Sequence, residues 1–422
     1  MSSPCNPLLW KSALVLAGSL LVTGCHIKHP PAESPCTDGT WAGGRIDPDA
    51  AVHVASDGSD ASDGSADSPL ASLAAALAQA EDTGPKAIFV GPGTFPAGLH
   101  LASGTDDDLL IAGCSMEETT LEPADATVSD SIVSIKGASG VSLASLSTQG
   151  GSRAVLIEGT ADVGLDTVTI NASTRVGLVV YGAATVDLSE VYIDGTVADP
   201  DAAGSVGYGI SVQGADASLR ADISMEGGGI VGSSSVGFLA DTAELSLTEV
   251  EVSGTLADVS TGVSLLGRGV QVQNFSSLEM SNCNIHDNAD AAVFSISSAS
   301  LTIADSTLSG TAASAIPDAS DTTGDGLVAR RGDDDASFPV SYFTVDAQRN
   351  TIDGNQRAGA VLEDVTVAAL SGNTGSNAYG AGGLAFVVQG STDATAASDT
   401  VTTPATSLAL NTQAVVPDTG AD

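Results

Sequence analysis

Basic residues are scarce in this sequence. Its 422 residues contain 13 Lys and Arg against 52 Asp and Glu, which gives a formal net charge of −39. A nucleic-acid partner needs Lys and Arg to neutralise its phosphates, so this charge balance argues against DNA or RNA as a partner. Only 15% of the residues are charged, whereas 42% are hydrophobic. Because disordered chains combine low hydrophobicity with high charge, the composition predicts a folded protein.

Aromatic and histidine residues are also few. Phe, Trp and Tyr make up 4% of the chain, so the core has to be built from small aliphatic residues in close repetition. Of the five His, only His286 lies in the repeated part of the chain, beside Asn284 and Asn288. We expect such turn residues to hydrogen-bond the backbone. No Cys and His have the spacing of a zinc site, and no Gly-rich phosphate loop precedes a helix.

The chain has no apolar run of the roughly 20 residues that a membrane-spanning helix needs. The run Ser12–Val22 is shorter, follows Lys11 and ends in small residues, as secretory signals do. Its end, Val22-Thr23-Gly24-Cys25, resembles the lipobox of bacterial lipoproteins. The resemblance implies that residues 1–24 are a signal peptide and that Cys25 becomes a lipidated first residue.

The segment that follows Cys25 predicts a tether. Residues 25–50 contain four Pro and a Gly pair, a composition typical of a linker. Position 26 is His rather than Asp, which in the enterobacterial sorting rule indicates the outer membrane. We therefore expect an exported protein that the lipid anchor holds at the membrane.

Three cysteines remain once Cys5 and Cys25 are set aside. An oxidising envelope permits one disulfide among Cys36, Cys114 and Cys283. We favour the pair Cys36–Cys114, because both lie near the N-terminal end of the domain. Cys283 lies in a strand-like repeat and is expected to be a buried hydrophobic residue.

Residues 51–125 carry a distinctive order of elements. A short strand, Val52–Val54, is followed by an acidic turn at 57–67, a helix expected at 69–82 with Ser68 as its N-cap, and a second strand ending in a tight turn. This order resembles the N-terminal cap and first coils of the pectin lyase-like, right-handed parallel β-helix family. The resemblance implies an all-β solenoid with a short N-terminal capping helix.

Internal repetition supports the same fold over residues 126–390. A six-residue unit begins with a small residue and has apolar residues at its second and fourth positions, which we expect to point into a shared core. Each coil of a parallel β-helix would hold one such unit. Residues 391–422 predict one last strand, 407–416, and a loose tail. The unit fits nine segments: 154–159, 177–182, 209–214, 237–242, 269–274, 292–297, 326–331, 359–364 and 385–390.

The third position of the unit forms a mostly apolar column on the outside of the solenoid. Either the long turns that begin near Gly195, Gly254 and Gly310 fold back over this strip, or the strip is an exposed groove for a partner. We favour coverage by the turns. The column runs Leu156, Val179, Ser211, Leu239, Gln271, Phe294, Val328, Val361 and Val387. A polar column beside it, from Glu158 to Gln389, is expected to face mostly water.

Candidate residues for catalysis gather in one region, 321–357. Enzymes of this fold that cleave anionic polysaccharides by elimination use an acidic Ca²⁺ site and a Lys or Arg base. The candidates here are Arg330, Arg331, Asp333, Asp334 and Arg357. A salt-bridged turn is the interpretation we favour, because complete lyase, hydrolase and epimerase motifs are missing.

Calcium is the one cofactor with any sequence support. Oxygen ligands at close spacing suit this ion. Two acidic segments qualify, although neither has a regular binding loop: the first holds Asp57, Asp60 and Asp63, and the second Asp321 and Asp325.

Three functions remain open at this stage. The leading hypothesis is a non-catalytic binding or structural module, with polysaccharide as the expected ligand. The alternatives are a polysaccharide lyase-type enzyme that uses the patch at 321–357, and a protein-interaction rod whose outer strip meets another surface protein.

Overall fold

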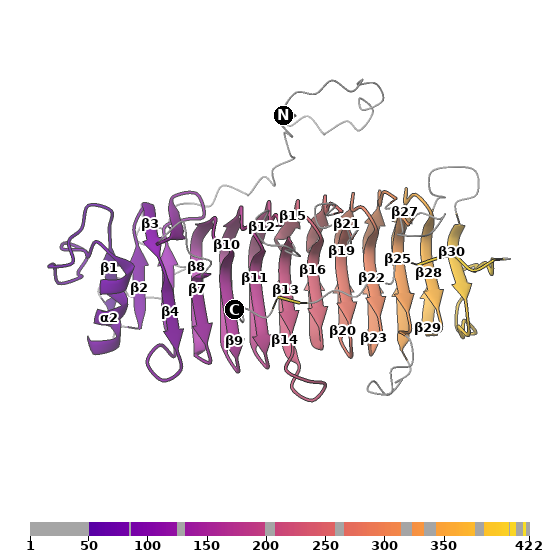
Figure 1. Cartoon of the computed structure of the whole chain (residues 1–422), viewed down its shortest axis with the longest axis horizontal. Coiled ribbons are helices and arrows are strands. Elements are labelled where there is room, and N and C mark those ends of the chain that lie inside the picture. The colour runs from indigo at the N-terminus through magenta and orange to yellow at the C-terminus, as the bar shows by residue number, and fades with distance from the viewer. Residues whose placement is uncertain are drawn as a thin grey trace, which may run out of the picture.

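The computed structural model describes residues 50–83, 86–124, 131–198, 207–257, 266–313, 323–332, 343–375, 384–404, 406–410 and 417–418, and the fold is stated for these residues. The chain winds into a stack of coils whose strands lie side by side in rows (Figure 1). All pairings between the named strands are parallel, and the strands form two sheets. The predicted parallel β-helix is therefore confirmed.

The first sheet has eleven strands, one from each coil. Ten intervals of about 4.8 Å between neighbouring strands make this row roughly 48 Å long. In chain order its strands are β4 (Leu99–Ala102), β7 (Ser131–Lys136), β9 (Arg153–Gly159), β11 (Val176–Gly182), β13 (Tyr208–Gln213), β16 (Val236–Asp241), β19 (Arg268–Gln273), β22 (Ala291–Ile296), β25 (Asp325–Arg330), β28 (Ala358–Glu363) and β30 (Leu384–Gln389).

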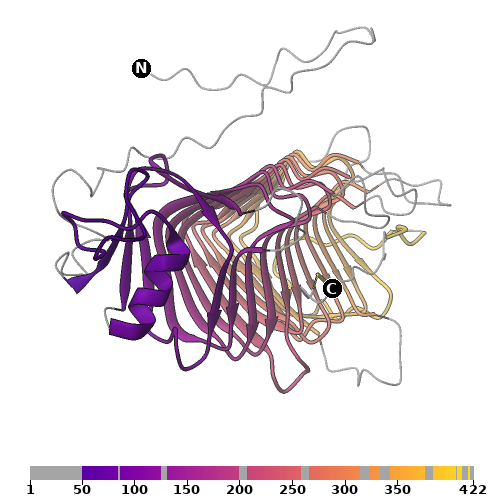
Figure 2. The ribbon, with the colours of Figure 1, turned by 60° about the vertical axis from the view of Figure 1, so that its left-hand side comes forward.

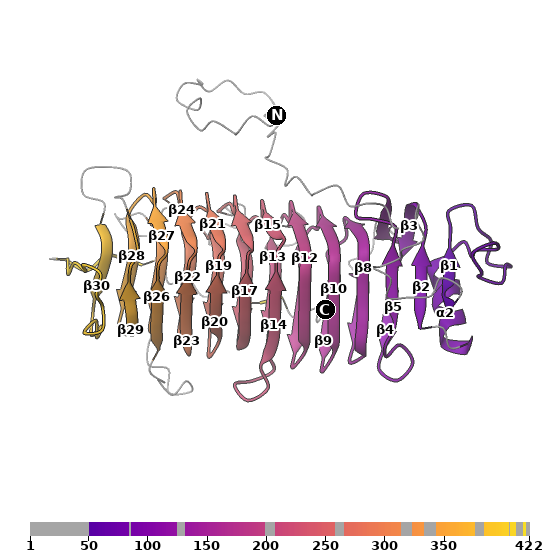
Figure 3. The ribbon, with the colours of Figure 1, turned by 180° about the vertical axis from the view of Figure 1, so that it is seen from behind.

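The second sheet has nineteen strands, and Figure 3 shows it from behind. Its strands are β1 (Val52–Val54), β2 (Ala87–Val90), β3 (Gly93–Ala97), β5 (Leu110–Gly113), β6 (Thr119–Pro123), β8 (Ser139–Gln149), β10 (Asp162–Asn171), β12 (Thr185–Asp194), β14 (Ala221–Glu226), β15 (Gly229–Val231), β17 (Ala243–Thr248), β18 (Glu251–Ser253), β20 (Ser277–Ser281), β21 (Asn284–His286), β23 (Ser300–Ala304), β24 (Thr307–Ser309), β26 (Thr344–Gln348), β27 (Thr351–Asp353) and β29 (Thr366–Ser371).

The core between the sheets consists of apolar residues stacked in register. Ile210 of β13 pairs with Phe238 of β16, which pairs with Val270 of β19, and all three are fully buried. The second and fourth positions of the repeat unit therefore point inward, as predicted, and each coil contributes like side chains to one continuous core.

A column of glycines explains the small residue that opens each unit. A Cβ atom at Gly237 would lie 2.6 Å from the backbone oxygen of Gly269 in the next coil and 2.6 Å from Val252 Cγ1 of the facing sheet. Gly209 and Gly269 are equally crowded. The close approach of backbone to backbone, rather than a positive φ, selects glycine here.

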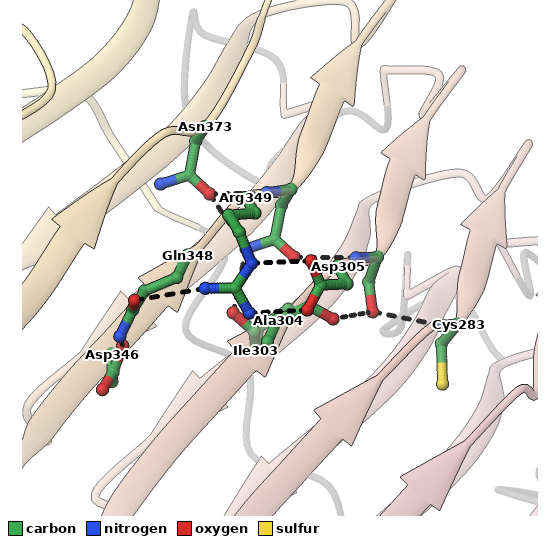
Figure 4. A network of polar contacts seen from close by, with 10 residues as sticks. Cys283, Ile303, Ala304, Asp305, Asp346, Gln348, Arg349 and Asn373 are labelled. Carbon is green, nitrogen blue, oxygen red and sulfur yellow. Dashed lines mark hydrogen bonds and ion pairs between the residues drawn. The ribbon is translucent and has the colours of Figure 1, made fainter.

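The corner between paired strands of the second sheet is held by polar side chains that reach from coil to coil (Figure 4). Asn350 Oδ1 accepts from the backbone N–H of Ser306 at 2.9 Å, and Asn350 Nδ2 donates to the carbonyl of Ile303 at 2.9 Å. Asn373 repeats this arrangement one coil on, where its Oδ1 accepts from Asn350 N at 2.9 Å. These bonds satisfy buried backbone groups at the turn. On the exposed side of the same corner, Arg349 pairs with Asp305.

The turn residues singled out by the sequence divide between two roles. Asn288 accepts from the backbone N–H of Thr255 at 3.1 Å, as expected. His286 differs, because its ring contacts side chains and not the backbone: Nδ1 lies 2.8 Å from Asp287 Oδ2, and Nε2 lies 3.2 Å from Glu251 Oε1. The two carboxylates raise the pKa of His286 to about 9.

A helix covers the first coil, at the near end of the stack in Figure 2. The helix α2 spans Leu73–Thr83 and buries Leu73, Ala76 and Ala80. The predicted start near residue 69 was wrong. The N-cap is Ser72, whose hydroxyl accepts from Ala75 N at 3.2 Å, whereas Ser68 pairs with Ser65 in a turn.

Candidate functional site

The outer strip of the eleven-stranded sheet is buried along its whole length. Its nine residues, from Leu156 to Val387, are between 0% and 7% exposed. The long turns were predicted to cover the strip, and Leu266, at the end of the turn that begins near Gly254, packs in one cluster with Leu156, Val179 and Leu239. Most of the three turns lies outside the described residues, and further described contacts come from the C-terminal segment. Thr402 first pairs beside Val387, and the described residues 406–410 and 417–418 then lie over the sheet. The strip is not an open groove.

One end of this segment covers the last coils. Leu408 and Leu410 pack on Val361 and Val387, and Leu410 also packs on the cluster around Phe294. The side chain of Gln389 exchanges two hydrogen bonds with the backbone of Leu408, at 2.8 and 3.0 Å. The described part of the predicted strand at 407–416 therefore contacts the sheet through apolar side chains and through its backbone, and it forms no named strand.

The other end reaches coils near the middle of the row. Asp418 Oδ1 lies 3.0 Å from Arg153 Nε, and its Oδ2 lies 3.1 Å from Arg175 Nη2. The backbone N–H of Asp418 donates to Ser211 Oγ at 3.1 Å. Both Asp418 and Arg153 are nearly inaccessible to solvent. The tail expected to be loose is instead anchored here by a buried ion pair.

Between these ends lies a buried polar network centred on Arg268, whose side chain is fully buried. Its Nε donates to Asp290 Oδ2 at 2.8 Å and its Nη1 donates to Gln271 Oε1 at 2.8 Å. The guanidinium carbon also lies 3.5 Å from the centre of the Phe294 ring, a cation–π geometry. Burial lowers the pKa of Arg268, and the Asp290 carboxylate opposes this effect.

The polar column expected to face water continues this network. Gln271 Nε2 donates to Gln273 Oε1 at 2.7 Å, and Gln273 Nε2 donates to Asp241 Oδ2 at 2.8 Å. Asp241, Gln273 and Gln389 are buried, with 4% to 7% of their surface exposed, whereas Tyr181 is 36% exposed. The prediction of a water-facing column was therefore wrong for these three residues.

The predicted Arg and Asp patch resolves into separate ion pairs. Arg330 Nε lies 3.1 Å from Glu363 Oε2, and Arg357 Nε donates to Asp325 Oδ1 at 3.0 Å. Asp325 is fully buried, and burial raises its pKa while Arg357 opposes the shift. Arg331 is half-buried just beyond β25. Asp321, Asp333 and Asp334 lie outside the described residues.

The calcium candidates that are described serve other contacts. Asp60 accepts from the backbone N–H groups of Ala71 and Ser72, at 2.9 and 2.8 Å, just before α2. Asp63 binds the backbone and hydroxyl of Ser65, Asp57 is exposed, and Asp325 holds Arg357. In the described ranges no three His, Cys, Asp or Glu side chains lie close enough together to hold a metal. Calcium binding stays a prediction.

The structure describes two of the five cysteines, Cys114 and Cys283. Cys114 is disulfide-bonded, and its partner lies outside the described residues, so the pairing with Cys36 stays a prediction. Cys283 is a free, buried cysteine, and burial raises the pKa of its thiol. Cys25 also lies outside the described residues. Within the described ranges no helix is long and apolar enough to cross a membrane.

Sequence reasoning missed Arg153, Arg268 and Asp418. A signal for Arg268 was present, because it stands directly before Gly269 at a position that holds Val176 and Val236 in other coils. Arg153 and Asp325 stand at the equivalent position of two other coils, and a charged residue at a position that is apolar in neighbouring coils indicates a buried partner.

The same fold is found in a known protein family and in solved structures. The family described as "Right handed beta helix region" matches residues 153–325. The chain is a right-handed parallel β-helix. No curated protein matches its sequence. Among solved structures, this β-helix is similar to the A-module of the Azotobacter vinelandii mannuronan C-5 epimerase AlgE6, with a TM-score of 0.51 and 14% identity over 77% of this chain and 94% of that one.

A second solved structure has a lower score. The alginate lyase from Paenibacillus sp. str. FPU-7 gives a TM-score of 0.42 and 16% identity, over 76% of this chain and 97% of that one. At 14% identity, the likeness to the epimerase module shows a shared fold alone, and a reaction has to be argued from the residues of the site itself.

Proposed function

We propose that this β-helix is an exported, lipid-anchored module that binds polysaccharide without cleaving it. The observation that carries the proposal is that most described cations of a protein with a net charge of −39 gather along one sheet, where five of them are held in ion pairs with carboxylates that the structure describes. Seven of the ten described Lys and Arg residues lie in the eleven-stranded sheet or next to its strands. They are Lys136, Arg153, Arg175, Arg268, Arg330, Arg331 and Arg357.

A polysaccharide ligand agrees with the repeated fold and with the neighbours. The solenoid repeats one short coil along its length, and a repeated scaffold suits a repeated ligand. The similar structures are named as a mannuronan epimerase and an alginate lyase, which act on polysaccharides. These names support polysaccharide as the ligand class. The low identity gives no support for a shared reaction.

The ion pairs of Arg330 and Arg357 favour binding without turnover. An elimination base has to take up a proton from the substrate. Arg330 contacts Glu363, and Arg357 contacts the buried carboxylate of Asp325. An adjacent carboxylate stabilises the protonated guanidinium, which makes either arginine a poor base.

The membrane anchor rests on the sequence alone. The lipobox-like Val22-Thr23-Gly24-Cys25 and the Pro-rich residues 25–50 support a lipid on Cys25 and a tether to the outer membrane. Two or more acyl chains are needed for stable anchoring. Labelled palmitate should enter the wild-type chain and not Cys25→Ala, and label in both would overturn the anchor.

A glycan screen tests the central proposal. The unlipidated chain from residue 26 would be presented with neutral and acidic polysaccharides, with and without Ca²⁺, while binding and new unsaturated or reducing ends are recorded. Binding without new ends supports the module. Product formation that Arg330→Ala abolishes would replace it with the lyase-type enzyme.

A further inference from the structure

The contacts of Asp418 have the form of a bound ligand. Its carboxylate lies between two guanidinium groups from successive coils, Arg153 on β9 and Arg175 just before β11. Its backbone N–H donates to Ser211 Oγ on β13, and the Ser211 hydroxyl lies 3.5 Å from its carbonyl oxygen. Three coils therefore contribute one group each to a single acidic residue.

The pocket is built for a negative charge. Arg153 is 4% exposed and Asp418 is 3% exposed, so both charges are removed from water. Removing one member of such a pair leaves an uncompensated buried charge, which is strongly unfavourable. Tyr208 lies close by, and burial together with the negative charge of Asp418 raises its pKa. If Asp418 leaves, the guanidinium groups of Arg153 and Arg175 are open to another anion.

The segment can leave without unwinding a coil. No ladder of hydrogen bonds between coils runs through the described residues 406–410 or 417–418. Its described contacts are the apolar packing of Leu408 and Leu410, the bonds with Gln389, a bond from Arg357 and the contacts of Asp418. The coils retain their own pairing when these contacts are lost.

We propose that Arg153, Arg175 and Ser211 form a carboxylate-binding site for an acidic sugar, and that the C-terminal segment is its internal occupant. This inference rests on the proposed function, because it names the uronate class of polysaccharide as the ligand. A uronate carboxylate takes the position of the Asp418 carboxylate between Arg153 and Arg175.

Competition between segment and sugar gives a measurable consequence. The apparent affinity for a ligand falls in proportion to the fraction of molecules whose site is open. If the segment occupies the site 90 to 99% of the time, its removal raises the affinity about tenfold to a hundredfold.

The experiment measures binding of an oligogalacturonate by calorimetry to the full chain from residue 26, to Asp418→Asn and to a chain that ends at residue 404. Both variants should bind at least about tenfold more tightly than the unchanged chain. Arg153→Gln in the shortened chain should abolish the gain. A synthetic peptide of residues 406–422 should compete with the sugar, and the same peptide with Asn at position 418 should not. Far-UV circular dichroism confirms that each variant retains its strands.

Three results would overturn the inference, and they differ from failure of the proposed function. Equal affinities for the folded variants and the full chain would mean that the segment is a permanent cover. Binding of the peptide to the shortened chain, with no acidic sugar competing, would mean that the site takes an acidic peptide and not a uronate. Binding of neutral glycans alone, unaffected by Asp418→Asn, would leave the module standing and remove this site.

Discussion

The buried ion pair between Arg268 and Asp290 gives the sharpest test of how the outer face is held together. The two side chains are 0% and 2% exposed and lie 2.8 Å apart. The change Arg268→Met keeps the length of the side chain and removes its charge. Asp290 is then left buried without its cation, and breaking a buried pair in this way costs about 3–5 kcal/mol of unfolding free energy.

Removal of both charges should cost much less. Replacing a buried pair by apolar residues of similar volume is often close to neutral. The double variant Arg268→Met/Asp290→Leu is therefore expected to recover most of the stability lost in the single variant. Gln271 also loses a donor in both variants, which sets a lower limit of about 1 kcal/mol on the remaining cost.

Urea unfolding followed by far-UV circular dichroism measures these free energies, and the exposed pair Arg349–Asp305 supplies the control. Its side chains are 57% and 44% exposed, so Arg349→Met should leave the midpoint unchanged. A loss for Arg268→Met no larger than that for Arg349→Met would refute the reasoning. A double variant as unstable as the sum of both single variants would refute it as well.

Three further predictions concern the coils and the cap. Gly237→Ala places a methyl group 2.6 Å from a backbone oxygen of the next coil and should cost about 1–3 kcal/mol in the same urea assay. His286 has a pKa raised to about 9 by Asp287 and Glu251. Its stabilising contribution is complete below about pH 6.5 and is lost as the pH rises through about 9, so the melting temperatures of wild type and His286→Gln should converge by pH 10. Asp60→Ala removes the acceptor for two N–H groups before α2 and should speed amide hydrogen exchange in that helix, and unchanged exchange would contradict the role of the side chain.

The coils were predictable because each repeats a short unit. The positions of Ile210, Phe238 and Val270 follow from that unit, since stacked coils bury the same positions each time. The C-terminal cover was not predictable, because the described residues beyond 402 follow no repeat. The helix starts at Leu73 and not near residue 69, because Asp60, distant in sequence, binds the N–H groups of Ala71 and Ser72 and so holds these residues outside the helix.

The contact of Asp418 with Arg153 joins residues 265 positions apart, in a protein whose other pairings mostly link one coil to the next. A one-dimensional stack of this kind frays from its ends, because each coil depends only on its neighbours. The returning chain instead ties the last coils to β9, the third strand of the eleven-stranded sheet, so that fraying at β30 is coupled to contacts made by early coils. So distant a contact forms only after the coils between its two ends have assembled. It therefore exists only in the complete solenoid and makes the unfolding of these coils more cooperative.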